Sequence, residues 1–204
     1  MSKITEISYQ KQNKNRCNLY VDGEFFAGIS LETVLLHRLK VGTECDKATL
    51  ENIIIENDKH EALLKATAYV SKTLKTKRQV KDYLIKKGYS EESAYHVIDK
   101  LKEYGYVNDQ EYSKRYIESV SKSQGKRLIE YKLMMKGVKK EEIENAYAAS
   151  ESDDFSNAKA VAEKHIKNKE KTKENIAKTY RYLIGRGFSY EQANYAVSEL
   201  SKED

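Results

Sequence analysis

The feature that most limits how this 204-residue chain can fold is a glycine that recurs at intervals of 49 and 50 residues. Leucine stands four residues before each glycine, and apolar residues stand six and ten residues after it. These offsets are helical on both sides of the glycine. A glycine directly after a helix is typical of a left-handed C′ cap. The pattern therefore predicts two helices joined at each of three turns, centred on Gly88, Gly137 and Gly187. Ser90 and Ser189 would cap the helix after the turn, and Ser189 with Gln192 would form a capping box.

A further amphipathic segment precedes each helix pair, at residues 61–72, 109–122 and 153–167. A period near 50 residues indicates a repeat array, in which each unit buries its apolar face against its own helices and its neighbours. We therefore expect a mainly α, elongated protein made of three tandem three-helix repeats. The expected repeats span residues 58–108, 109–152 and 153–204.

The N-terminal region, residues 1–57, has a different pattern. Asp22-Gly23 lies between two β-favouring runs, which is a strong signal for a hairpin turn. We expect two or three antiparallel strands over about residues 4–29, followed by two short helices. Ser30 would cap the first helix, which carries Leu31, Val34, Leu35 and Leu39 on one face, and Asp46 would cap the second, which carries Leu50, Ile53 and Ile54.

Composition narrows the class of protein. Charged residues are 34% and hydrophobic residues 39% of the chain, and the net charge of +5 mildly favours an acidic partner such as nucleic acid. Cys17 and Cys45 fit no metal spacing and are expected to be reduced thiols. The N-terminal residues lack the apolar core of a signal peptide, and no run approaches the length of a membrane span. We expect a soluble, cytoplasmic protein.

The sequence carries no recognised catalytic set. A P-loop is absent, no GxGxxG follows a strand, and the four histidines fall on separate predicted helices. We therefore predict a protein that is not an enzyme and that has no cofactor and no metal. An enzyme with a dispersed site stays open as an alternative, because sequence does not show which titratable groups converge. The tyrosines mostly lie on or beside apolar faces, where packing is the simpler role and base stacking the alternative.

Cations gather between the first and second helix of each repeat, at a junction that we call the elbow. Charged turns and the helix dipole explain part of this pattern, but equivalent elbows in a stacked array would also form a regular basic stripe. Such a stripe would follow a phosphate backbone or an acidic groove in a protein polymer, and spacing does not separate the two. The candidate binding residues are Lys72, Lys75, Lys77 and Arg78 in the first elbow, Lys122, Lys126 and Arg127 in the second, and Lys169, Lys171 and Lys173 in the third.

The ordered series of motifs resembles the RecX family. The first repeat contains TKRQVKDYL at 76–84, KKGY at 86–89, VIDKL at 97–101 and GYVND at 105–109. The second contains SQGKRLI at 123–129 and KGV at 136–138, and the hairpin at Asp22-Gly23 is similar to the N-terminal extension of RecX proteins from Gram-positive bacteria. Gln79 and Asn108 depart from the acidic residues that are common at these positions.

The resemblance implies a function that the spacing does not. RecX proteins bind filaments of the RecA recombinase on single-stranded DNA and inhibit recombinase activity in DNA repair and recombination, without hydrolysing anything themselves. The resemblance therefore implies a regulatory protein whose partner is the RecA filament. We expect a monomer that does not bind membranes. The alternative is a helical-repeat module that binds single- or double-stranded DNA directly through its basic elbows.

Overall fold

The computed structural model describes residues 1–150 and 152–202, and within them it contains ten helices and four strands. The chain divides into two compact units. Unit 1 comprises residues 1–73 and 80–106, and unit 2 comprises residues 74–79 and 107 onward. The expected third repeat ends at residue 204, so its last two residues lie outside the described part. The prediction of a mainly α protein with a small β region before helical repeats is confirmed.

Unit 1 begins with a small antiparallel sheet. Strands β1 (Ser2–Gln10), β2 (Asn13–Val21) and β3 (Glu24–Ser30) pair in the order β3-β2-β1-β4, where β4 is the short pair Glu44–Cys45. Asp22 and Gly23 both have positive φ, at 51° and 86°, as a type I′ hairpin turn requires. The predicted hairpin is therefore confirmed, and β4 is an addition that the sequence analysis did not anticipate.

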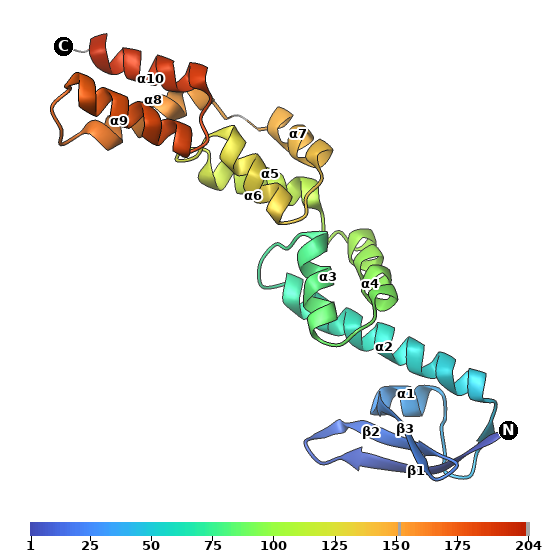
Figure 1. Cartoon of the computed structure of the whole chain (residues 1–204). Helices are drawn as coiled ribbons and strands as arrows, with labels where there is room; N and C mark the ends of the chain where they lie inside the picture. Colours follow the sequence, from blue (N-terminus) through green and yellow to red (C-terminus); the bar gives the residue numbers. More distant parts are fainter. Residues whose placement is uncertain (151, 203–204) are drawn as a thin grey trace. The chain divides into compact units, whose positions relative to one another are not determined.

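The core of this region lies between the sheet and the first two helices. Ile4, Leu19 and Ile29 of the sheet are buried together with Leu50 of helix α2 (Lys47–Val70). Figure 1 shows the strands and helix α1 (Leu31–Leu36) beside the first half of α2. The side chain of Ser30 caps α1 as expected, by accepting a hydrogen bond from Thr33 N.

Two expectations for this region were wrong. The face predicted for the first short helix included Leu35, but Leu35 is 68% exposed, because α1 has only six residues and turns Val34 rather than Leu35 toward the core. The two helices predicted on either side of residue 57 are one continuous helix, α2. Between the two predicted helices lies Asn57, whose buried Oδ1 accepts hydrogen bonds from Ser30 N at 2.9 Å and Thr33 Oγ1 at 2.8 Å.

The remaining helices form the expected repeats. The second half of α2 serves as the first helix of repeat 1, so the proposed boundary between residues 57 and 58 falls inside this helix. The other repeat boundaries stay predictions. The helices are α3 (Lys77–Lys86) and α4 (Glu91–Glu103) in repeat 1; α5 (Asp109–Val120), α6 (Lys126–Met135) and α7 (Lys140–Ala148) in repeat 2; and α8 (Asp154–Ile166), α9 (Lys173–Gly185) and α10 (Tyr190–Lys202) in repeat 3.

Predicted helix caps are also confirmed. Ser90 Oγ accepts a hydrogen bond from Ser93 N at the start of α4. At the start of α10, Ser189 N donates to Gln192 Oε1 and Gln192 N donates to Ser189 Oγ, which completes the predicted capping box. Each cap fixes where the third helix of its repeat begins.

Candidate functional site: the elbows and the glycine turns

The three glycine turns have the same backbone geometry. Gly88, Gly137 and Gly187 have φ values of 90°, 84° and 89°, in the left-handed region that glycine occupies without strain. In each turn the residue after the glycine donates its N–H to the carbonyl of the leucine four residues before the glycine, at 3.1 to 3.2 Å. This is the pattern of a glycine-terminated helix. The turns therefore have equivalent backbones in the three repeats.

In unit 2 the first elbow packs onto the turn of repeat 2. Thr76 Oγ1 donates a 2.7 Å hydrogen bond to Lys136 O, directly before Gly137. A Cβ placed on Gly137 would lie 2.4 Å from Cδ and 2.5 Å from Cβ of Arg78. The side chain of Arg78 therefore occupies the space over the glycine, and its predicted role as a candidate binding residue competes with a structural one.

The second elbow makes the equivalent contact with the turn of repeat 3. Gly125 N donates to Arg186 O at 2.9 Å and Arg127 N donates to Gly187 O at 3.2 Å. A Cβ on Gly187 would lie 2.4 Å from Leu128 Cβ, and a Cβ on Gly125 would lie 2.3 Å from Phe188 N. We call each such contact, between the start of the second helix of one repeat and the glycine turn of the next, a repeat joint. Both joints lie within unit 2.

Charged groups support the first repeat joint. Lys77 N donates to Asp109 Oδ1 at 2.9 Å, and Lys77 Nζ lies 2.7 Å from Glu142 Oε1 and 3.9 Å from Asp109 Oδ2. Asp109 is 2% exposed. Burial raises the pKa of Asp109, while the Lys77 N–H and ammonium oppose that rise. Burial disfavours the charged form of Lys77, but the hydrogen bond to Glu142 and the two carboxylates outweigh it and raise the Lys77 pKa.

The structure thus divides the ten sequence-predicted cations. Lys77 and Arg78 belong to the first joint, and Lys126 and Arg127 flank the second, where Lys126 Nζ lies 3.8 Å from Glu130 and 4.9 Å from the centre of the Tyr147 ring. The side chains of Lys126 and Arg127 nevertheless remain exposed. Lys75 is half-buried, and the other exposed cations are Lys72, Lys122, Lys169, Lys171 and Lys173. Their role in binding stays a prediction.

The third elbow is built differently from the other two. Helix α9 is capped by Thr172, fifteen residues before Gly187, whereas Gly125 caps α6 twelve residues before Gly137. One extra helical turn therefore precedes the positions that form the joint in repeats 1 and 2. Beside this turn lies an open groove of about 660 Å³, lined by Lys171, Lys173, Ile176, Ala177, Tyr180, Arg181, Asn194, Val197 and Ser201.

Each turn also carries a cation over a tyrosine ring. The cation is the residue directly before the glycine, and its distance to the ring centre is 5.8 Å for Lys87 and Tyr83, 5.8 Å for Lys136 and Tyr116, and 5.0 Å for Arg186 and Tyr182. These are ordinary cation–π distances. The recurring basic residue before each glycine therefore has a packing role that the sequence analysis missed, although its fixed spacing was visible in the sequence.

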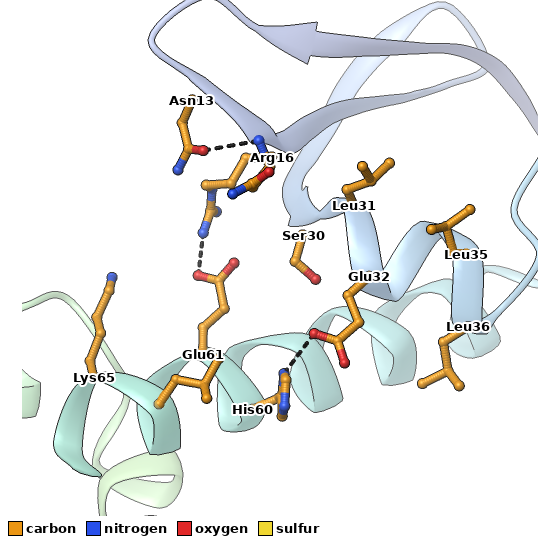
Figure 2. A pocket seen from close by; sticks show the side chains of 12 residues that line it. Asn13, Arg16, Ser30, Leu31, Glu32, Leu35, Leu36, His60, Glu61 and Lys65 are labelled. Carbon is orange, nitrogen blue, oxygen red and sulfur yellow. Dashed lines mark hydrogen bonds and ion pairs between the residues drawn. The ribbon is translucent and has the colours of Figure 1, made fainter. Parts of the chain in front are cut away.

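A second surface feature lies in unit 1, between α1 and α2. A pocket of about 920 Å³ is lined by the exposed side chains of Leu35, Leu36 and Leu64. Figure 2 shows Leu35 and Leu36 of α1 along it. Arg16 pairs with Glu61, and His60 lies 3.9 Å from Glu32 across the same opening. The sequence analysis missed this pocket, because it assigned Leu35 to the core.

Membrane-spanning helices and groups of metal-ligating side chains are both absent from the described residues. Within residues 1–150 and 152–202 no helix combines the length and apolar content needed to cross a bilayer. Nor does this part of the chain bring three or more His, Cys, Asp or Glu side chains together in a group suited to a metal ion.

Comparison with known proteins covers nearly the whole chain. Four family models match in order. They describe the regulatory protein RecX N-terminal domain at residues 2–46 and the first, second and third three-helix domains of RecX at residues 62–101, 108–146 and 151–197.

Curated relatives and solved structures agree with these matches. The regulatory protein RecX of Clostridium tetani is 34% identical over 209 residues, which cover 100% of this chain and 97% of the relative. That of Bacillus licheniformis is 30% identical and is covered to 80%. A crystal structure of regulatory protein RecX has a TM-score of 0.68 at 24% identity, with both chains fully covered. RecX from Lactobacillus salivarius has a TM-score of 0.66 at 23% identity, over 72% of this chain and 98% of that one.

Proposed function

The chain belongs to the RecX family of regulatory proteins, and from this premise we propose that it binds RecA recombinase filaments on single-stranded DNA and inhibits their activity in DNA repair and recombination. The observation that carries the proposal is the match of all four RecX domains, in order and over nearly the full chain.

The structure of unit 2 is compatible with this role. Its two repeat joints hold successive repeats by hydrogen bonds to the turn and by side chains packed on the glycine. Repeats that contact their neighbours in this way offer a continuous surface rather than a single deep site. A protein filament is the kind of partner that such a surface suits.

A filament assay tests the proposal directly. The purified protein is expected to lower the ATPase activity of RecA on single-stranded DNA and to shorten RecA filaments seen by electron microscopy. A variant with a damaged second repeat joint, Gly187→Ala, should inhibit less at equal concentration. Unchanged ATPase activity and unchanged filament length in the presence of the wild-type protein would refute the proposal.

The second candidate is a module that binds DNA directly, and the exposed side chains of Lys126 and Arg127 favour it. The double reversal Lys126→Glu with Arg127→Glu leaves the backbone donors of the joint in place. If these side chains contact phosphates, the reversal should weaken binding to bare single-stranded DNA and reduce the salt slope by about 1 to 2. The matched control is Arg115→Glu with Lys140→Glu, which makes the same charge change at exposed positions of unit 2 away from the elbows.

The same two variants separate the candidates. Lost DNA binding with intact RecA inhibition would show that protein contact is the main mode. If the elbow reversal removes DNA binding and RecA inhibition together, that result would favour direct action on DNA. Equal effects of the elbow reversal and its control would show that net charge, and not the elbow, matters.

A further inference from the structure

The turn of repeat 1 has the same backbone as the two turns in the repeat joints. Gly88 N donates to Ile85 O at 2.9 Å, and Tyr89 N donates to Leu84 O at 3.2 Å. We call Lys87, Gly88 and Tyr89 the open turn, because no heavy atom of the other described residues lies within 4 Å of a Cβ built on Gly88. At Gly137 and Gly187 the same space is filled.

Exposure of the neighbouring side chains follows the same difference. The residue after the glycine is 4% exposed in repeat 2, where it is Val138, and 0% exposed in repeat 3, where it is Phe188. In repeat 1 the residue is Tyr89, which is half-buried, and Lys87 and Gly88 are exposed. A tyrosine suits a surface that is wet in the free protein and covered in a complex. Unit 1 thus presents one half of a repeat joint to solvent.

The two occupied turns define the chemistry of what covers such a surface. In both, the start of a helix brings a donor to the carbonyl directly before the glycine: Thr76 Oγ1 in one joint and Gly125 N in the other. In both, a side chain two or three residues further on, Arg78 or Leu128, places its β-carbon over the glycine. The complementary segment is therefore the first turn of a helix with a hydroxyl or N–H donor at its cap and an aliphatic stem behind it.

The elbow positions that form the two repeat joints are not free to supply that segment from a second copy of this chain. The first two elbows are already engaged in joints. In repeat 3, the residue twelve positions before the glycine is Asn175, which lies inside α9 and donates its N–H to Thr172 Oγ1 at 3.3 Å. The third elbow thus lacks the free donor that Gly125 provides in repeat 2.

Charge around the open turn also selects the partner. Lys65 and Lys87 are exposed, with Lys65 Nζ 5.1 Å from the Tyr89 ring centre. The nearby carboxylates are paired elsewhere, since Glu91 binds Lys81 at 3.0 Å and Glu92 binds Lys59 at 3.2 Å. The turn therefore carries excess positive charge, which complements the carboxylates that helix first turns favour. The elbows of this chain are basic and therefore carry the same sign of charge as the open turn.

We propose that the open turn is a docking site for the N-terminal turn of a helix on another protein, with a hydroxyl or N–H donor at its cap and carboxylates in its first turn. On the basis of the proposed function, we assign this helix to the RecA recombinase. The docked helix would donate to Lys87 O and pack an aliphatic stem over Gly88, as the chain's own helices do at the two repeat joints.

The test places a side chain over the open turn without forbidding its backbone. Asparagine tolerates the left-handed region, so Gly88→Asn fills the space while the turn persists. The matched control is Gly105→Asn in the same unit, because Gly105 also follows a helix, has a φ of 74° and has no described atom within 4 Å of a built Cβ. Affinity for RecA filaments on single-stranded DNA is measured by fluorescence anisotropy of labelled protein.

We expect Gly88→Asn to weaken filament binding roughly tenfold or more, with Gly105→Asn equal to wild type and with the same melting temperature for both variants. A photo-cross-linker replacing Tyr89 should attach to the start of a recombinase helix, and one replacing Tyr106, after the control glycine, should not. Equal filament affinity of the two glycine variants would overturn this inference but leave the proposed function standing.

Two other outcomes also decide the matter. If wild-type protein does not bind the filament at all, both the proposed function and this inference fail. If Gly88→Asn abolishes a self-association seen by analytical ultracentrifugation while filament binding is unchanged, the occupant is a second copy and the inference is wrong.

Discussion

The substitution Gly187→Ala tests whether the repeat joints hold unit 2 together. Alanine at a φ of 89° costs about 1 kcal/mol in backbone strain alone. Its Cβ would lie 2.4 Å from Leu128 Cβ and 2.5 Å from Leu128 N, so the start of α6 must move away. That movement breaks the bonds from Arg127 N to Gly187 O and from Gly125 N to Arg186 O, which contribute about 1 kcal/mol each. The expected total is about 3 kcal/mol.

Gly88→Ala is the matched control, because Gly88 has the same place in its repeat and a φ of 90°, with no described atom within 4 Å of the added carbon. It should cost about 1 kcal/mol. Native-state hydrogen exchange measures each loss in its own unit, on amides of α9 and α10 for Gly187 and of α3 and α4 for Gly88. Equal losses at the two glycines would refute the idea that the joint is a stabilising contact.

Three further predictions concern side chains of unit 2. Lys77→Met leaves the buried Asp109 without its ammonium and should destabilise unit 2 by roughly 1–3 kcal/mol in urea unfolding, whereas Lys140→Met, at an exposed ion pair, should change stability by less than about 1 kcal/mol. The buried Tyr147 hydroxyl has no hydrogen-bond partner among the described residues, so Tyr147→Phe should raise stability by about 1 kcal/mol, while Tyr131→Phe at an exposed ring should be neutral; a loss of stability at Tyr147→Phe would contradict this. Burial and Lys169 lower the pKa of His165 in the folded protein. Folding therefore favours the neutral imidazole. The contribution of His165 to the free energy of unfolding is present above pH 6.5 and is lost as the pH falls through the folded pKa. NMR titration should place the His165 pKa below 6.5, and His165→Gln should remove this part of the pH dependence; a pKa above 6.5 would show the reasoning to be wrong.

Local signals predicted much of the fold correctly. The Asp22-Gly23 turn, the glycine caps and the Ser189 capping box depend on residues close together in sequence, and the structure contains all of them. The continuity of α2 through Asn57 was not predicted, because the bonds of Asn57 to its partners Ser30 and Thr33 are not visible in a local pattern. Those partners lie more than twenty residues away, beyond the reach of periodicity.

The candidate site was predicted less well, for a related reason. The sequence places cations at each elbow, but it does not show that Arg78 covers Gly137 or that Lys77 reaches Asp109. Both contacts join residues more than thirty positions apart. Spacing in a repeat identifies equivalent residues, whereas packing between repeats decides which of them are used inside the protein and which face solvent.

The repeat joints have a direction, and the extra turn of α9 makes the elbow of repeat 3 different from the other two. In each joint the beginning of one helix packs onto the glycine turn of the following repeat. A repeat therefore has a donor side, its elbow, and an acceptor side, its glycine turn. The three residues by which α9 extends past the α6 pattern place Asn175 inside the helix, at the position that Gly125 occupies in repeat 2. Deleting them would regenerate an elbow of the kind that Gly125 forms, to which a fourth repeat could be fused in frame.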